Sequence, residues 1–254
     1  ASSIPTLSTM TNNGLINYTS LFCVALVWMS CGTPSSPDPI ENSAQEAAAP
    51  SPMLVILDAE RTGINFVNRV IEDDSANYLN YRYIYNSGGV ATGDLDNDGL
   101  PEIVCVSNRN GGAIYKNNGD LKFSDVTKTA GFNLVGLWAT GVCMMDANAD
   151  GLLDIYVCGS GPGYWPVKYR RNRLYINKGA LKFVDEAAER GVADEGHHTA
   201  ASFADLDGDG DLDVFILAHR VDFKNLNNAI TDPRFLPVAD QSDRLYLNDG
   251  TGHF

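Results

Sequence analysis

Three nine-residue segments of this chain place oxygen-bearing side chains at the same intervals. They are Asp94–Glu102, Asp146–Asp154 and Asp205–Asp213, called loops 1, 2 and 3 below. Each carries such a side chain at positions 1, 3, 5 and 9 and a glycine at position 6. Side chains at positions 1, 3 and 5 can turn inward around one cation, and the glycine permits the sharp turn that this requires. Calcium accepts a large, loosely arranged shell of oxygens, whereas magnesium demands a strict octahedron and zinc favours His or Cys. The loops therefore predict calcium sites.

The predicted ligands are the side chains at positions 1, 3, 5 and 9 and the carbonyl at position 7. The loops differ in charge, because loop 1 ends in a longer Glu and loop 2 has a neutral Asn at position 3, so we expect loop 3 to bind most tightly. An EF-hand loop closes with Glu at position 12, which excludes that class here. The ligand set is Asp94, Asp96, Asp98, Leu100, Glu102, Asp146, Asn148, Asp150, Leu152, Asp154, Asp205, Asp207, Asp209, Asp211 and Asp213.

Short apolar strands flank the three loops in the same order. First strands are expected at 89–93, 139–145 and 199–204, and second strands at 103–106, 155–158 and 214–217. Third strands are expected at 113–117, 173–177 and 244–248, and fourth strands begin at 122, 182 and 253. Four-stranded units that repeat every 50 to 60 residues or so are typical of a β-propeller. The fold class is therefore all-β, a partial propeller of about three four-stranded blades.

The repeated loops, with the segments Tyr83–Asp94 and Trp138–Gly141, resemble the FG-GAP/VCBS repeat family, which also occurs in integrin α chains. Within it the chain is most similar to bacterial repeat lipoproteins of the ASPIC/UnbV type, related to cartilage acidic protein. The resemblance covers roughly residues 62–254. It implies calcium-loop blades that belong to a larger propeller, because three blades do not close a ring. The last blade should then present an apolar outer face.

The expected organisation has four parts. Residues 1–31 are predicted to be a signal peptide or lipoprotein leader, 32–55 a disordered Pro/Ser/Ala-rich tether and 56–88 a lead-in segment. The repeats occupy 89–254, at about 89–131, 138–191 and 199–254, the last of them truncated. Leu21–Met29 is an apolar run too short for a membrane span, and it is followed by Ser30 and Cys31, the predicted lipidation site. No Lys or Arg precedes residue 31, so a plain secreted protein, or a buried strand or helix at this run, stays an alternative.

Composition agrees with an extracytoplasmic module. The formal net charge is −14, and the three loops hold twelve of the carboxylates, so nucleic acid is not an expected partner. Cys105, Cys143 and Cys158 all fall in predicted strands and are interpreted as buried thiols, with a single disulfide as the alternative.

The sequence offers little that suggests catalysis. It contains no nucleophile elbow, phosphate loop or zinc-protease motif. His197 and His198 are adjacent, so on a strand their rings should point to opposite faces. We expect no enzymatic activity of this segment.

A partner is expected at the face opposite the calcium loops. There the connection 159–172 gathers aromatic and basic residues on an otherwise acidic protein, and these either bind a ligand or pack the loop. The function expected is an extracytoplasmic adhesion-like module that binds a protein or glycan, with about three structural Ca²⁺ ions. It would be lipid-anchored at the outer membrane of a Gram-negative bacterium or secreted. The alternative is the non-catalytic part of a larger secreted enzyme. The candidate ligand residues are Tyr164, Trp165, Lys168, Tyr169, Arg170 and Arg171.

Overall fold

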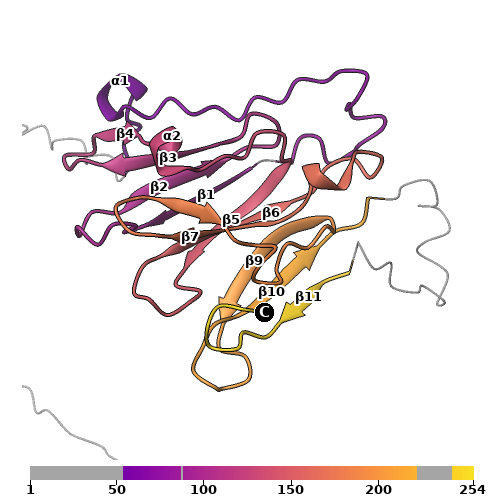
Figure 1. Cartoon of the computed structure of the whole chain (residues 1–254). Helices are drawn as coiled ribbons and strands as arrows, with labels where there is room; N and C mark the ends of the chain where they lie inside the picture. Colours follow the sequence, from indigo (N-terminus) through magenta and orange to yellow (C-terminus); the bar gives the residue numbers. More distant parts are fainter. Residues whose placement is uncertain (1–53, 87, 222–241) are drawn as a thin grey trace, which may run out of the picture. The chain divides into compact units, whose positions relative to one another are not determined.

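A computed structural model describes residues 54–86, 88–221 and 242–254 of the chain (Figure 1). The predicted leader, with Cys31, and the predicted tether up to residue 53 lie outside the described residues. Most of the second long insertion, 222–241, lies outside them too. Within the described ranges, no helix reaches the length and hydropathy needed to cross a membrane.

Three antiparallel sheets follow one another along the described chain. The first two have four strands each, in the orders β1-β2-β3-β4 and β5-β6-β7-β8, and the third has the order β11-β10-β9. Two one-turn helices and one 3₁₀ turn are the described helical elements. The bounds are β1 Gly89–Gly93, β2 Glu102–Val106, β3 Gly112–Asn117, β4 Phe123–Asp125, β5 Ala139–Met145, β6 Asp154–Gly159, β7 Arg173–Asn177, β8 Phe183–Asp185, β9 His198–Ala204, β10 Asp213–Ala218, β11 Arg244–Tyr246, α1 Ala59–Thr62, α2 Thr127–Ala130 and η1 Val167–Tyr169.

The observed strands confirm the predicted repeat, with small differences at the ends. The third strand of the third sheet ends at Tyr246 rather than at Asn248, and His253 and Phe254 are not assigned to a strand. The predicted fourth strand of that sheet is therefore absent from the described residues. All pairings are antiparallel, so the β1–β2, β5–β6 and β9–β10 loops lie at the same end of their sheets as the β3–β4 and β7–β8 turns.

The second sheet packs against a core on each face, which explains why residues 155–158 of its inner strand β6 are all apolar. In β6, Ile155 and Val157 belong to a core shared with the first sheet, whereas Tyr156 and Cys158 belong to a core shared with the third. Strand β10 instead alternates, with Val214 buried and Phe215 41% exposed. The exposed positions Phe215, Leu217 and Leu245 of the third sheet, with Leu247 just after β11, form the predicted apolar outer face.

The lead-in segment is built on a motif that recurs before each sheet. A helical turn ends in a left-handed glycine at Gly63, Gly131 and Gly191, with φ near 80° in each case. A Cβ at these glycines would lie 2.4, 2.9 and 2.4 Å from the carbonyl oxygens of Phe123, Phe183 and Phe254 respectively. Only glycine permits both the positive φ and the close approach. Residues 58–63 therefore repeat an element that elsewhere joins one sheet to the next.

The three strand cysteines are free thiols in the structure and form no disulfide with one another, but only Cys158 is fully buried as predicted, whereas Cys105 and Cys143 are half-buried. Cys158 is fully buried between the second and third sheets, and Cys143 packs against the same core. Burial raises the pKa of the Cys143 thiol to about 12, so this thiol is protonated at neutral pH.

Candidate metal-binding loops and the opposite face

The backbone of each acidic loop is closed by its first carboxylate. Position 6 is a glycine with positive φ in all three loops, at +86°, +85° and +101°. Its N–H donates to an oxygen of the position-1 carboxylate, which leaves the other side chains free to converge. Position 4 is also left-handed, although it is a glycine only in loop 3. The closing bonds run from Gly99 to Asp94 Oδ2 (2.8 Å), from Gly151 to Asp146 Oδ2 (2.8 Å) and from Gly210 to Asp205 Oδ2 (3.2 Å).

The structure brings the predicted ligands together in loops 1 and 3. One oxygen each from Asp94, Asp96 and Glu102 lies within 4.8 Å of the others, and the equivalent oxygens of loop 3 do the same. Each loop also holds one buried side-chain oxygen without a hydrogen-bond partner: Asp96 Oδ1, Asn148 Oδ1 and Asp211 Oδ1. Buried polar atoms are rarely left unpaired, and an oxygen shell is what a hard cation needs. The residues present therefore fit calcium.

Loop 2 differs from the other two loops because position 3 is Asn148. Its amide nitrogen donates to Asp150 Oδ2 at 3.0 Å, so one of the predicted ligand oxygens is already engaged within the loop. The loop also has one carboxylate fewer than loop 1. Both features favour weaker metal binding here than in loop 3.

The acid at position 9 has a structural role beyond its predicted ligand role. Glu102, Asp154 and Asp213 are fully buried, and each accepts two backbone N–H bonds. Asp154, for example, accepts from Ala147 at 3.0 Å and from Asn177 at 2.7 Å. Burial raises the pKa of Asp154 to about 6, and it raises that of Glu102 too, whereas the two N–H bonds lower the pKa of Asp213.

An asparagine at or just after the end of each third strand, called the clasp asparagine below, bonds its own acidic loop. In two of the three blades it also bonds the preceding loop. The Asn177 amide donates to Leu153 O of its own loop at 3.0 Å and to Leu95 O of loop 1 at 2.8 Å. Asn248 likewise bonds Leu212 O and Ala147 O, both at 3.1 Å. The Asn117 amide N–H donates only to its own loop, at Pro101 O. The repeated Asn was visible in the sequence as the last residue of each predicted third strand, but nothing in the spacing revealed this clasp.

Lys116 is a second residue that sequence reasoning missed. Its ammonium group forms ion pairs with Asp96 and Asp98, two of the predicted ligands of loop 1. The signal was present in the sequence, because the residue before the repeated Asn is apolar in the other two units.

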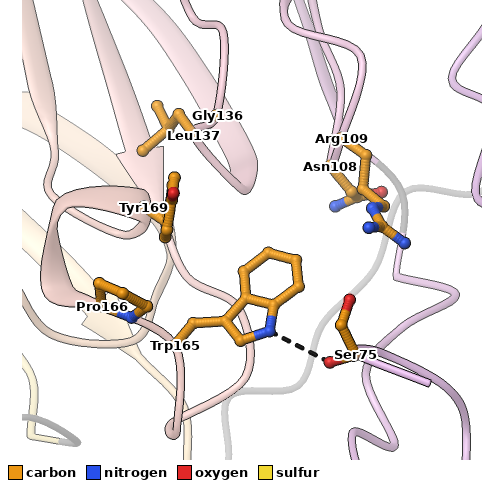
Figure 2. A pocket seen from close by; sticks show the side chains of 8 residues that line it. All are labelled: Ser75, Asn108, Arg109, Gly136, Leu137, Trp165, Pro166 and Tyr169. Atoms are coloured by element: carbon orange, nitrogen blue, oxygen red, sulfur yellow. Dashed lines mark hydrogen bonds between the residues drawn. The ribbon is translucent and has the colours of Figure 1, made fainter. Parts of the chain in front are cut away.

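The predicted ligand residues at the opposite face have two kinds of role. Trp165 and Tyr169 line a pocket of about 460 Å³, with Ser75, Asn108, Arg109, Gly136, Leu137 and Pro166 (Figure 2). Tyr164, Arg170 and Arg171 instead hold the loop in place. Tyr164 donates to Ser75 O at 2.7 Å, Arg170 to Glu195 O at 2.7 Å, and Arg171 forms an ion pair with the Glu195 carboxylate.

Packing and exposure coexist at Trp165. Its indole N–H donates to Ser75 O at 3.1 Å (Figure 2). Its ring also meets the Trp138 ring edge to face, with the ring centroids 5.6 Å apart. The Arg109 guanidinium lies 5.6 Å from the ring centroid, and Lys168 lies 5.0 Å from that of Tyr169. The side chain is thus both a packing residue and a wall of the pocket.

The two adjacent histidines point to different environments, as predicted. His198 Nδ1 lies 3.0 Å from Asn172 Oδ1, and its Nε2 lies 3.3 Å from the Asp194 carboxylate. The His197 ring instead lies near Ser160 and His219, and the centroids of the His197 and His219 rings are 6.2 Å apart. His219 was not singled out from the sequence, because it stands alone after a strand.

Successive antiparallel sheets of three or four described strands share apolar cores and carry an acidic loop between their first two strands. They define a β-propeller segment with each sheet as one blade. The FG-GAP-like repeat model matches residues 80–157 and 164–216, slightly more than half of the chain. The chain belongs to the FG-GAP-like repeat family, which confirms the predicted resemblance.

Curated relatives agree with this assignment. The chain is 29% identical over 132 residues to cartilage acidic protein 1 of Xenopus tropicalis, a match that covers 52% of this chain and 20% of the relative. It is 27% identical over 132 residues to cartilage acidic protein 1 of Homo sapiens, which covers 52% of this chain and 19% of the relative. The chain thus spans about a fifth of the length of the curated relatives it matches.

Proposed function

We propose that this chain is a calcium-stabilised propeller segment that works outside the cytoplasm by binding a protein or glycan, not by catalysis. The observation that carries the calcium part is the buried, unpartnered oxygen in each loop, at Asp96, Asn148 and Asp211. A hard cation supplies a partner to these atoms and neutralises the carboxylates around them.

Charge repulsion explains why the ion would stabilise the fold. In loop 3, burial raises the pKa of Asp207 and of Asp211, and the nearby Asp209 carboxylate adds to both shifts. A bound cation favours the ionised carboxylates and closes the hairpin between β9 and β10. Because only the folded chain holds these side chains together, calcium stabilises the folded state by mass action.

The binding surface proposed is the pocket beside η1. Trp165 and Tyr169 offer aromatic surface, and Asn108 and Arg109 offer polar groups around it. Aromatic side chains with a few fixed polar groups are typical of ligand pockets. Because the calcium loops lie at the other end of the strands, metal and ligand would act through separate regions.

The location rests on the leader sequence. Leu21–Met29 followed by Cys31 favours export and lipid attachment at the outer membrane. Expression of the whole chain in a Gram-negative host with labelled palmitate tests this, with Cys31→Ser as the control. Label that persists in the Cys31→Ser variant would contradict attachment at this residue.

Calorimetric titration of the whole chain with calcium tests the metal part. We expect about three sites, and we expect Asp205→Ala/Asp207→Ala/Asp209→Ala to remove one site and lower the melting temperature in calcium. The matched control is Glu60→Ala/Asp74→Ala/Glu189→Ala, which removes three exposed acids outside the loops. Equal losses in the two triple variants would contradict a site in loop 3.

The binding part is tested by screening the chain on arrayed glycans and on arrayed extracytoplasmic proteins. Trp165→Ala should abolish binding to any partner found, whereas Val135→Ala, an 86% exposed residue outside the pocket lining, should not. Binding that survives Trp165→Ala unchanged would show that Trp165 only packs the loop.

A further inference from the structure

Loop 1 contains its own positive charge. Lys116, the next-to-last residue of β3, places its Nζ against Asp96 Oδ2 and 3.0 Å from Asp98 Oδ2. These acids occupy positions 3 and 5, the centre of the predicted ligand set. The Lys116 side chain is 30% exposed and that of Asp96 17%, so the pair is partly shielded from water.

The equivalent residues of the other two blades are apolar. Each third strand is followed or ended by the clasp asparagine, and the residue before it is Lys116, Ile176 or Leu247. Ile176 is fully buried, and Leu247 is 49% exposed. Among the described residues near loops 2 and 3, Lys178 and Arg190 both form ion pairs with Glu186 rather than with the loop acids.

We propose that Lys116 is a built-in counter-ion of loop 1, which holds that loop together without metal and makes it the weakest of the three calcium sites. This inference rests on the proposed function, because it ranks sites that the proposed function postulates. An ammonium group is a compact point charge that competes with calcium for the same carboxylate oxygens. A calcium ion entering loop 1 must displace it, or bind beside it against charge repulsion.

The lysine does not complete the site. Asp96 Oδ1 stays buried without a hydrogen-bond partner while Oδ2 of the same carboxylate contacts Lys116. Loop 1 therefore retains an oxygen for a metal, so its calcium affinity is lowered and not abolished. Sequence comparison of the ligand positions alone would rank loop 2 lowest, because loop 2 has fewer carboxylates than loop 1.

The position-6 glycine amides allow each loop to be observed separately. Gly99, Gly151 and Gly210 each donate their N–H to the position-1 carboxylate, so a metal bound to that carboxylate shifts the amide resonance. The experiment is a calcium titration of the whole chain labelled with ¹⁵N-glycine. We expect Gly99 to shift at the highest calcium concentration of the three.

Two variants test the effect of the lysine charge: one removes it beside loop 1, and the other adds it beside loop 3. Lys116→Leu should lower the calcium midpoint of Gly99 by about tenfold or more, the effect of removing a unit charge about 5 Å from a divalent ion. The midpoints of Gly151 and Gly210 should stay in place. Leu247→Lys, at an exposed position, should raise the midpoint of Gly210 by a similar factor and leave Gly99 unchanged.

A measurement without metal provides an independent readout. In a calcium chelator, Lys116→Leu should melt at a lower temperature than the wild type, because the loop 1 acids lose their counter-ion. Leu247→Lys should melt at the wild-type temperature or above it. If Lys116→Leu does not fold, Lys116→Met replaces it, because methionine keeps an unbranched stem. The Leu247→Lys titration still tests whether a lysine at this position raises the calcium midpoint of its loop.

The outcomes separate the two proposals. A Gly99 midpoint that is the lowest of the three, or that does not change in Lys116→Leu while the other loops titrate normally, overturns the role of Lys116 and leaves the calcium function intact. If no loop amide responds to calcium in the wild type or in either variant, the proposed calcium function itself fails.

Discussion

The two ends of the strands are constructed in different ways. At the acidic-loop end, the same bonds recur in every blade: a position-6 amide to a position-1 carboxylate, a buried position-9 acid and a clasp asparagine. At the opposite end, the β2–β3 connection is a short turn, whereas the β6–β7 connection is a long loop that carries η1 and the pocket aromatics. The repeated end defines the blade, and the variable end is free to differ.

This difference indicates which contacts stabilise every blade and which are particular to one blade. The bonds that recur in every blade stabilise each loop and its hairpin, and the clasp bonds of Asn177 and Asn248 also join neighbouring blades, so the loss of one should weaken the stack. Connections that differ between blades carry their own packing and are the usual place for binding residues. Substitutions at the acidic-loop end should therefore change stability, whereas substitutions at the opposite end should act on the packing or binding of a single connection.

The largest effect is expected at the position-9 acid. Asp154→Ala leaves the N–H groups of Ala147 and Asn177 without their buried acceptor, which should cost about 3 kcal/mol of unfolding free energy. Asp154→Asn retains one acceptor oxygen and should cost clearly less. Urea unfolding of both variants checks this, and equal losses would show that the bonds to the carboxylate contribute nothing specific.

The next effect belongs to the opposite end and depends on pH. Burial, with a smaller contribution from His198, lowers the pKa of His219 to about 4. An unfolded histidine titrates near 6.5, so between about pH 6.5 and 4 the unfolded chain takes up a proton that the folded chain does not. Stability from this group is therefore present above pH 6.5 and is lost as the pH falls to about 4, by about 3 kcal/mol.

His219→Gln should flatten this part of the stability profile, measured by urea unfolding in chelator at several pH values. His253→Gln, which changes an exposed histidine, should retain the wild-type slope. A slope that is unchanged in His219→Gln would contradict the role assigned to this buried ring.

Substitution of a clasp asparagine should lower the unfolding free energy by a smaller amount, and this amount should differ between blades. Asn177→Ala removes a bond to its own loop and a bond to loop 1, and should cost about 2 kcal/mol. Asn117→Ala removes the bond to Pro101 O but none to another blade, and it should cost about 1 kcal/mol less than Asn177→Ala. Both variants also remove a bond that a turn glycine, Gly119 or Gly179, donates to the Asn side-chain oxygen. If chemical unfolding gives the two variants the same stability, the bond between blades has no net value.

The smallest effect is expected at position 4 of loop 2. Ala149 has φ +57°, a left-handed conformation that costs a residue with a Cβ about 1 kcal/mol. Ala149→Gly should therefore raise the unfolding free energy by up to about 1 kcal/mol, which the melting temperature will show. Asn97→Gly in loop 1 should gain less, because asparagine tolerates this conformation. A loss of stability in Ala149→Gly would mean that lost backbone entropy outweighs the relieved strain.

Much of the fold followed from local sequence patterns. The strands around the loops were predicted within a few residues because alternating apolar runs and Gly/Asn turns are local signals. The convergence of three acids in loop 1 and in loop 3 followed for the same reason, since positions 1 to 9 lie in one short loop. The apolar outer face of the third sheet, with Phe215 and Leu245, followed from the repeat itself.

What the sequence did not reveal depends on contacts between distant residues. The bond from Asn177 to Leu95 O joins residues 82 positions apart, and Lys116 reaches Asp96 across 20 positions. The second role of Glu102 as an acceptor of two N–H bonds was hidden by its expected role as a ligand. The environment of Trp165 was equally hidden, because its partners Ser75 and Trp138 lie on other segments.

Thermal unfolding of the whole chain at increasing calcium, with magnesium at equal concentrations as the comparison, tests the central claim most directly. If the acidic loops hold structural calcium, the melting temperature rises steadily with calcium and much less with magnesium, whose octahedral demand these loops do not meet. A melting temperature that is the same in chelator, calcium and magnesium would contradict the claim that these loops stabilise the propeller through a bound cation.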